Sequence, residues 1–300
     1  MIYNIRNISA CFFSCLLILR GRIKNLKVKS RKGELILSVY FHNPSKKLFE
    51  KSVKWFLKNG FHFISVDELE DILKNKKKFP ASAVIFTVDD GWKENKSNIF
   101  PTAIKYKIPV TIFISTQPVE SGDRYWWSYI EKANKERLVS KSVSELKYVT
   151  NNDRIKIVND VKDKIISERE AMTILELQEY KDCNFIHFGA HTVTHPILTQ
   201  CEDHVSSFEI SESQKKLKDW LGYNINSFAY PNGNYAQREI EELKKSNYKI
   251  AFTTVPRYIT SETQDSIFEI PRFDVLEEVS FIENTCRMTG VWFNRKINKF

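Results

Sequence analysis

Short apolar stretches alternate with longer amphipathic stretches from Glu34 onward, and this alternation restricts the possible folds more than any other feature of the chain. The apolar stretches are rich in β-branched and aromatic residues, as is typical of strands buried on both faces. Strands that are each followed by a helix favour a mainly parallel sheet, because parallel neighbours must be joined by a crossover. We predict strands at Leu35–Phe41, Ala83–Val88, Val110–Ser115, Phe185–Ala190, Ser227–Tyr230, Lys249–Thr254 and Ile267–Phe273.

Amphipathic stretches separate these strands, and seven strands alternating with helices fit a closed (β/α) barrel better than an open sheet. Spacing alone is compatible with both architectures. We predict helices over Ser45–Asn59, Val66–Asn75, Lys96–Lys107, His204–Leu221 and Tyr235–Ser246.

Residues from about 120 to 172 break this rhythm. Three aromatic residues, Tyr125, Trp126 and Trp127, precede a polar stretch rich in Lys and Glu. Such a stretch favours a helical insertion that packs over one end of the sheet. Since no Gly/Ser-rich linker divides the chain, we predict that residues 34–300 form one domain containing this insertion.

Residues 1–33 differ from the rest of the chain in charge. They contain eight basic and no acidic residues, while the whole chain has a formal net charge of +9. The remaining residues are therefore nearly neutral, which argues against a basic groove that binds nucleic acid. The uncharged apolar run Ile8–Leu19 would reach only ~18 Å as a helix, short of the ~30 Å hydrocarbon core of a bilayer.

An apolar helix face too short to span a bilayer, followed directly by basic residues, favours binding to an anionic membrane surface. We predict a cytoplasmic protein held at the membrane by residues 1–33, and five cysteines without a C-x-x-C pair favour a reducing compartment. The alternatives are a basic leader packed on the domain and an atypical export signal. The predicted apolar face consists of Ile8, Cys11, Phe12, Cys15, Leu16 and Leu19.

Two adjacent carboxylates, Asp89 and Asp90, follow the predicted strand Ala83–Val88, and Gly91 lets the chain turn sharply after them. Barrel and open-sheet enzymes both carry their sites at the carboxyl ends of the strands. The alternative is an ordinary turn in which an aspartate caps the next helix.

Two histidines four residues apart, His191 and His195, follow the predicted strand Phe185–Ala190. Their imidazoles can turn to the same side and bind one metal ion, and Pro196 indicates that His195 lies in a loop. Taken alone, the pair could also be two surface histidines. One carboxylate and two imidazoles at strand ends together match a divalent-metal site with open positions, and a second carboxylate beside it could act as a base toward water.

At this point the chain resembles the polysaccharide deacetylases with the NodB-homology domain. The family motif T-F-D-D-G appears at residues 87–91 with Val88 in place of Phe, and the motif H-[ST]-x-x-H appears intact at residues 191–195. Between them, residues 100–101 and 106–113 are similar to the stretch P-x-L…y-g-I-P-a-T-f-F of the family.

Two further motifs resemble one branch of this family. The sequence S-F-A-Y-P-N-G at residues 227–233 is similar to f-a-Y-P-y-G, which is the third motif in that branch. The branch also has a Tyr-His motif on its first strand, which Tyr40-Phe41-His42 resembles with one residue inserted. The resemblance covers about Leu35 to Arg272.

The resemblance implies a distorted seven-stranded (β/α) barrel that removes N-acetyl groups from amino-sugar polymers or glycans. It implies that Asp90, His191 and His195 bind one divalent metal ion, zinc first, with cobalt, nickel and iron as alternatives. It also implies that Asp89 is the catalytic base.

The same branch implies that His42 is the general acid. Because side chains alternate along a strand and Phe41 is inserted, the alternative is a strand-end histidine without a role. Tyr230 is implied to lend its backbone N–H to an oxyanion hole, and its alternative is a strand that simply ends before Pro231.

Three other residues are candidates for the site. Arg272 could orient Asp89 through a charge-assisted hydrogen bond, or it could be an exposed arginine at a strand end. Trp126 and Trp127 could stack on sugar rings, or they could form the private core of the insertion.

We therefore expect a metal-dependent hydrolase that removes N-acetyl groups from an N-acetylated glycan. Two alternatives stay open: a deacylase or C–N hydrolase acting on a small amide that is not a glycan, and an inactive carbohydrate-binding relative. The presence of both aspartates and both histidines argues against the inactive relative, since a binding protein needs no base beside its metal ion.

Overall fold

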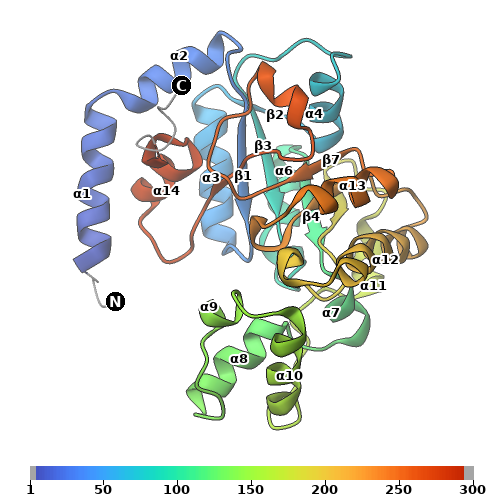
Figure 1. Cartoon of the computed structure of the whole chain (residues 1–300). Helices are drawn as coiled ribbons and strands as arrows, with labels where there is room; N and C mark the ends of the chain where they lie inside the picture. Colours follow the sequence, from blue (N-terminus) through green and yellow to red (C-terminus); the bar gives the residue numbers. More distant parts are fainter. Residues whose placement is uncertain (1–4, 294–300) are drawn as a thin grey trace.

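The computed structural model describes residues 5–293, and eight strands within them form one sheet (Figure 1). All strand pairs in this sheet are parallel, and the order is set by helical crossovers on the outside. The strands are β1 (Leu37–Phe41), β2 (His62–Phe63), β3 (Ala83–Val88), β4 (Val110–Ile114), β5 (Ile186–Ala190), β6 (Ser227–Ala229), β7 (Ile250–Phe252) and β8 (Phe273–Asp274).

The sheet closes into a barrel through its last segment. Its order is β7-β6-β5-β4-β3-β1-β8, and Phe273 of β8 pairs with Val39 of β1. Three residues before β8, Ile270 forms a parallel bridge with Phe252 of β7 at the other end of this order. The distorted seven-stranded (β/α) barrel is therefore confirmed. Six predicted strands overlap observed strands closely, whereas the seventh, predicted at Ile267–Phe273, is the two-residue strand Phe273–Asp274, with Ile270 forming a separate bridge to β7.

Strand β2 was not predicted. It pairs with β3 outside the main strand order and has only two residues. Two residues are too few to show the alternation of apolar and polar side chains that indicates a strand.

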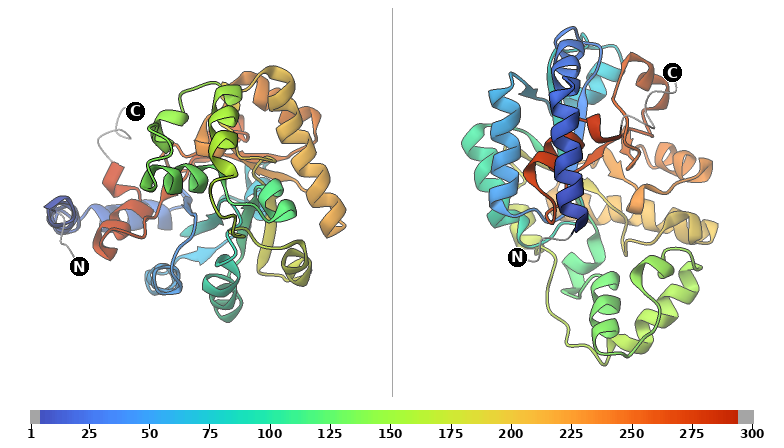
Figure 2. Two further views of the ribbon diagram at one scale, coloured as in Figure 1. Left: turned by 90° about the horizontal axis from the view of Figure 1, so that it is seen from below. Right: turned by 90° about the vertical axis from the view of Figure 1, so that its left-hand side faces the viewer.

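The helices lie outside the barrel and in the stretch between β4 and β5 (Figure 2). Those that follow predicted strands begin and end close to the predicted limits. The helices are α1 (Ile5–Leu19), α2 (Arg22–Arg31), α3 (Lys46–Lys58), α4 (Val66–Leu73), α5 (Asn95–Asn98), α6 (Phe100–Tyr106), α7 (Thr116–Ser121), α8 (Trp126–Lys135), α9 (Val143–Leu146), α10 (Asn151–Lys162), α11 (Ile174–Tyr180), α12 (Asp203–Leu221), α13 (Gln237–Lys245) and α14 (Phe281–Met288).

The predicted helix Lys96–Lys107 is in fact two helices, α5 and α6, that meet at Ile99. Pro101 stands at the start of α6. Proline has no backbone N–H and its ring clashes with the preceding turn, so a continuous helix cannot pass through it, whereas the first turn of a new helix accepts it.

Alternate residues of the strands contribute to two apolar clusters. Phe86 of β3 packs outward against Phe49 and Phe56 of α3, with ring centroids 5.8 and 5.5 Å apart. Its neighbour Ile85 belongs to a second cluster, which also contains Phe113. Burial on both faces explains why these strands read as continuous apolar runs.

Two parts lie outside the barrel. Helices α8, α9 and α10 form a small body with its own apolar cluster below the barrel in Figure 1. Helices α1 and α2 flank the barrel beside α14. Among the described residues, no helix is long and apolar enough to cross a bilayer. The predicted N-terminal segment 1–33 and the predicted domain 34–300 include residues 1–4 and 294–300, which lie outside the described residues. The boundary between segment and domain at residue 33 stays a prediction.

Candidate active site

Three predicted metal ligands meet at the carboxyl ends of β3 and β5, which lie on either side of β4 in the sheet. Asp90 lies in the turn after β3, and His191 and His195 lie in the loop after β5. Oδ1 of Asp90 is 3.5 Å from Nε2 of His191 and 3.4 Å from Nε2 of His195. All three ligand atoms lie within 4.8 Å of one another, which is close enough for one ion to contact them all.

The protonation of His191 suits a metal ligand. Its Nδ1 lies 2.7 Å from the carbonyl oxygen of Ala229. A carbonyl can only accept, so Nδ1 must carry the hydrogen, which leaves a free lone pair on Nε2 toward Asp90. Metal-binding histidines typically have this second hydrogen bond.

Buried atoms of the other two ligands lack partners. Oδ1 of Asp90 and Nδ1 of His195 are both buried and have no hydrogen-bond partner within residues 5–293. Burial, and then the neighbouring His191, lower the pKa of His195 to about 3, so its imidazole is neutral and can coordinate. A carboxylate oxygen and two imidazole nitrogens that converge in this way fit a divalent cation such as zinc.

The backbone around the ligands is strained. Asp90, Thr192 and His195 have φ angles of +77°, +67° and +55°, in the left-handed region that costs non-glycine residues roughly 1–2 kcal/mol each. Two side chains at the start of the insertion hold this conformation. The Tyr125 hydroxyl donates to the carbonyl oxygen of Asp90, and the Trp126 indole N–H donates to that of His195, both at 2.9 Å.

A buried glutamate organises the histidine loop. Glu209 of α12 accepts hydrogen bonds from the backbone N–H groups of Val193 and Thr194, each at 2.8 Å, and from the Thr194 hydroxyl at 2.6 Å. The loop between the two histidines is therefore anchored to the body of the barrel.

Asp89 forms a bidentate ion pair with Arg272. Two guanidinium nitrogens donate to its two carboxylate oxygens at 2.7 and 2.8 Å, and Arg272 is fully buried. The same guanidinium group donates to the Thr87 hydroxyl and to the Thr253 carbonyl oxygen, each at 2.9 Å. Burial alone would raise the pKa of Asp89, but the charge and hydrogen bonds of Arg272, together with the nearby His191 and His42, outweigh it and lower the pKa below its ordinary value. The alternative of an exposed Arg272 is thus excluded.

His42 lies on the wall of the same cavity as Asp89 and Asp90. Strand β1 ends at Phe41, which points into the apolar core, and His42 is the first residue beyond the strand. Strand alternation therefore no longer governs its direction, and the inserted residue does not turn it away from the cavity.

The cavity has a volume of about 300 Å³, and most of the predicted site residues line it. Its walls come from the strand ends and from the insertion. It is lined by His42, Asp89, Asp90, Trp92, Trp126, Trp127, Glu131, Val143, Lys147, His191, His195, Ile197, Asn232 and Thr254.

The two predicted tryptophans occupy different positions. Trp126 is 8% exposed, and its indole N–H donates a hydrogen bond to the His195 carbonyl oxygen. Trp127 is half-buried, stacks on Tyr125 with ring centroids 4.5 Å apart and packs edge-on against His195 at 4.6 Å. Both therefore support the metal ligands as well as lining the cavity.

The structure does not bring Tyr230 to the site. Its backbone N–H, predicted to be an oxyanion donor, instead donates to the Phe252 carbonyl oxygen at 3.0 Å as part of the pairing of β6 with β7. Its hydroxyl donates to the Phe268 carbonyl oxygen at 3.1 Å, and the residue does not line the cavity. The reason is that the β6–β7 pairing continues one residue beyond the end of β6.

Sequence reasoning missed three residues that act on the ligands: Trp92, Tyr125 and Glu209. Trp92 donates its indole N–H to Oδ2 of Asp90 at 2.9 Å, and its place directly after Gly91 was a usable signal. Tyr125 stood beside the two tryptophans. Nothing in the pattern of α12 distinguishes Glu209 from a solvated glutamate.

Comparisons with known proteins agree with this geometry. The model of the polysaccharide deacetylase family matches residues 76–251. A poly-beta-1,6-N-acetyl-D-glucosamine N-deacetylase of Staphylococcus aureus is 24% identical over 249 residues, which are 80% of this chain and 73% of that protein.

Solved structures share the fold. IcaB from Ammonifex degensii superimposes with a TM-score of 0.62 at 18% identity, over 86% of this chain and 97% of that one. The Streptococcus pyogenes deacetylase PplD, in complex with acetate, gives a TM-score of 0.58 at 20% identity, over 85% and 98% of the two chains.

Proposed function

The chain belongs to the polysaccharide deacetylase family, and on that premise we propose that it is a metal-dependent enzyme that removes N-acetyl groups from an amino-sugar glycan. The observation that carries this proposal is the convergence of Asp90, His191 and His195 beside the ion-paired Asp89 in one cavity. A metal site with a carboxylate base next to it is the arrangement that amide hydrolysis needs.

Asp90, His191 and His195 would hold one divalent ion, zinc first, with cobalt, nickel and iron as alternatives. When bound, such an ion polarises a carbonyl as a Lewis acid and lowers the pKa of a water. The orphaned Oδ1 of Asp90 and the free Nε2 lone pair of His191 support this assignment.

Asp89 would be the general base. Its carboxylate is held by Arg272 in one orientation and stays ionised at neutral pH, since its pKa is lowered. It would take a proton from the attacking water, whose oxygen bonds to the acetyl carbon.

His42, which lines the same cavity, would be the general acid. As the C–N bond breaks, a protonated His42 would give its proton to the departing nitrogen. The products are acetate and the free amine of the sugar, so one water is consumed for each acetyl group released.

The substrate class rests on the relatives and on the aromatic wall of the cavity. The Staphylococcus aureus relative is named for poly-beta-1,6-N-acetyl-D-glucosamine. In this chain Trp127 presents an aromatic surface beside polar groups such as Glu131 and Lys147, and such a surface suits a sugar ring.

Acetate release tests the proposal. Purified protein would be assayed with chitooligosaccharide, poly-N-acetylglucosamine, capsular glycans and a set of small N-acyl amides, with Asp89→Asn as the inactive control. We expect acetate from at least one glycan. Turnover of small amides alone would identify a C–N hydrolase of another kind, and glycan binding without acetate release would identify an inactive relative; either result contradicts the proposal.

A further inference from the structure

Helix α1 turns its larger apolar side chains away from the protein. The face packed on the barrel consists of small residues and one leucine: Ala10, Ser14 and Leu17 are all buried. The opposite face carries Ile5, Ile8, Phe12 and Leu19, which are 80%, 56%, 67% and 81% exposed. These four residues are called the α1 outer face below. Exposed apolar side chains gathered on one helix face usually mark a binding surface.

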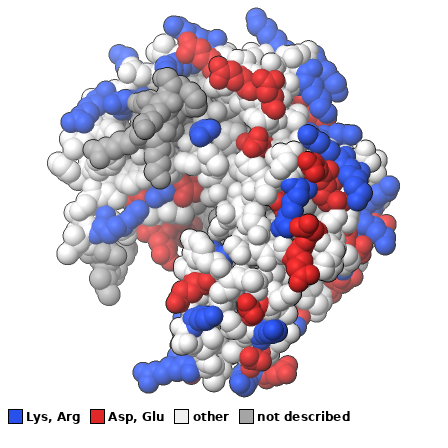
Figure 3. Space-filling model, in the orientation of Figure 1, with Lys and Arg blue, Asp and Glu red and all other residues white. Residues whose placement is uncertain are grey.

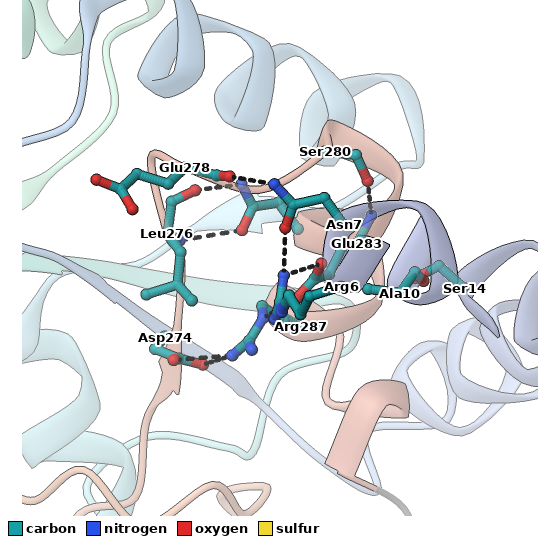
Figure 4. Close-up of polar contacts among 11 residues, drawn as sticks. Arg6, Asn7, Ala10, Ser14, Asp274, Leu276, Glu278, Ser280, Glu283 and Arg287 are labelled. Atoms are coloured by element: carbon teal, nitrogen blue, oxygen red, sulfur yellow. Dashed lines mark hydrogen bonds and ion pairs between the residues drawn. The ribbon is translucent and has the colours of Figure 1, made fainter. Parts of the chain in front are cut away.

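The orientation of α1 is fixed by specific contacts with α14 and the loop before it (Figure 4). Arg6 donates to both carboxylate oxygens of Glu283, at 2.7 and 2.8 Å, and Glu283 is fully buried. Asn7 donates to the Glu278 carbonyl oxygen at 3.2 Å. The helix therefore cannot roll to bury its outer face against the barrel without breaking these bonds.

Exposed cations follow the α1 outer face along the chain, directly after α1 and in α2. Arg20, Arg22, Lys24, Lys29 and Arg31 are exposed, and none of them forms an ion pair with a carboxylate of the described residues. Figure 3 shows basic side chains along the upper left of the molecule, where α2 lies. An apolar surface flanked by unpaired positive charge calls for a partner that is both apolar and anionic.

We propose that the α1 outer face and the basic residues of α2 bind the surface of a lipid bilayer that contains anionic lipid, with α1 lying in the plane of the interface. This proposal does not depend on the catalytic activity. At 15 residues α1 is about 22 Å long, too short to span the ~30 Å hydrocarbon core but long enough to bury its outer face among the headgroups.

A second copy of the chain fits this surface less well. A helix face about 22 Å long and about 10 Å wide offers roughly 220 Å² per copy, well below the ~800 Å² per partner of a stable dimer. A symmetric contact through α1 would also bring two sets of basic α2 residues together, and their like charges would repel.

Co-sedimentation of the full chain with vesicles tests the proposal. Vesicles of phosphatidylcholine alone would be compared with vesicles that also contain phosphatidylglycerol, at low and high salt. We expect binding to the anionic vesicles that weakens as salt rises. In the variant Lys24→Gln/Lys29→Gln/Arg31→Gln, the partition coefficient should fall about 100-fold, since each cation contributes ~1 kcal/mol near anionic lipid.

The apolar part is tested by Phe12→Ser/Leu19→Ser, which should lower partitioning about tenfold or more. These side chains are exposed, so an unchanged melting temperature would show that the fold is intact. The matched control is Phe208→Ser/Lys215→Gln on α12, where Phe208 is 55% exposed far from α1, and it should bind like the unmodified chain. Equal partitioning of all variants would overturn the proposal, and so would a dimer in sedimentation analysis that Phe12→Ser/Leu19→Ser abolishes.

Discussion

The guanidinium group of Arg272 donates hydrogen bonds to both carboxylate oxygens of Asp89, although the two residues are 183 positions apart in the chain. Arg272 precedes the strand that closes the barrel, and Asp89 follows β3. The orientation of the proposed base therefore depends on closure of the barrel.

Replacing Arg272 by Met should shift the pH profile as well as lower the rate. Asp89 must be ionised to accept a proton, so kcat/KM falls as pH drops through its pKa. Since the charge of Arg272 lowers this pKa against the opposing effect of burial, its removal raises the pKa and moves the acid limb to higher pH. The variant should also lose about 3–5 kcal/mol of stability, because Asp89 is left buried and unpaired. Arg257→Met, an exposed control, should change neither the profile nor the melting temperature. An unshifted acid limb would show that Asp89 is not the titrating base.

Loss of one metal ligand should abolish stoichiometric metal binding. We expect one divalent ion per chain in the unmodified protein and close to none in His195→Ala, measured by elemental analysis after dialysis. His204→Ala, which changes an exposed histidine of α12, should keep the metal. Chelation should remove activity, and added zinc should restore it. Equal metal content in the two variants would contradict the ligand assignment.

Asp89→Asn and His42→Ala should each keep the metal but lose rate. A single general base or acid contributes ~10²–10⁴-fold, and this is the expected fall in kcat for each variant. Wild-type activity in metal-loaded Asp89→Asn would rule out the proposed mechanism.

Tyr125 and Trp126 should raise the metal affinity although neither is a proposed metal ligand, because each holds the backbone of one. Tyr125→Phe removes the hydroxyl that donates to the Asp90 carbonyl, and Trp126→Phe removes the N–H that donates to the His195 carbonyl. Loss of such supporting contacts typically weakens metal binding 10–100-fold, which competition with a chelating dye would measure. Tyr129→Phe is the matched control, since its hydroxyl donates to Ser167 instead. Unchanged affinity in both variants would mean that the rest of the barrel suffices to hold the strained backbone.

Gly91→Ala should destabilise the protein more than Gly222→Ala. Both glycines have positive φ angles, +86° and +81°, so both substitutions carry the same backbone strain. A Cβ at Gly91 would also lie 2.7 Å from Cδ1 of Ile114, whereas a Cβ at Gly222 meets no atom of residues 5–293 within 4 Å. We expect an additional loss of about 1–3 kcal/mol for Gly91→Ala, measured by chemical denaturation. Equal losses would show that Ile114 moves aside freely.

The barrel and the convergence of Asp90, His191 and His195 were predictable because their signals are local. Each strand is buried on both faces and therefore reads as an apolar run, and Asp90, His191 and His195 directly follow such runs. Residues that close a strand can be assigned to one edge of a parallel sheet before any contact is known.

The remaining features depend on contacts between distant segments. The burial of Arg272 follows from barrel closure, and the role of Glu209 follows from the position of α12 beside the histidine loop. The sequence predicts that the backbone N–H of Tyr230 is an oxyanion-hole donor. This prediction fails because the sequence does not show how far the pairing of β6 with β7 extends. The length of such a pairing depends on tertiary contacts, and the hydrophobic pattern of the sequence does not indicate it.

Helix α1 is synthesised long before the segment on which it packs. Its partner α14 follows far along the chain, and the contact between Ser14 and Cys286 spans 272 residues. At the ~5–20 residues per second of protein synthesis, α1 leaves the ribosome roughly 14–54 s before that partner exists. During this interval neither its small face nor its outer face is covered by the barrel. If α1 binds a bilayer as proposed, a membrane beside the translating ribosome would therefore encounter α1 before α14 has been synthesised.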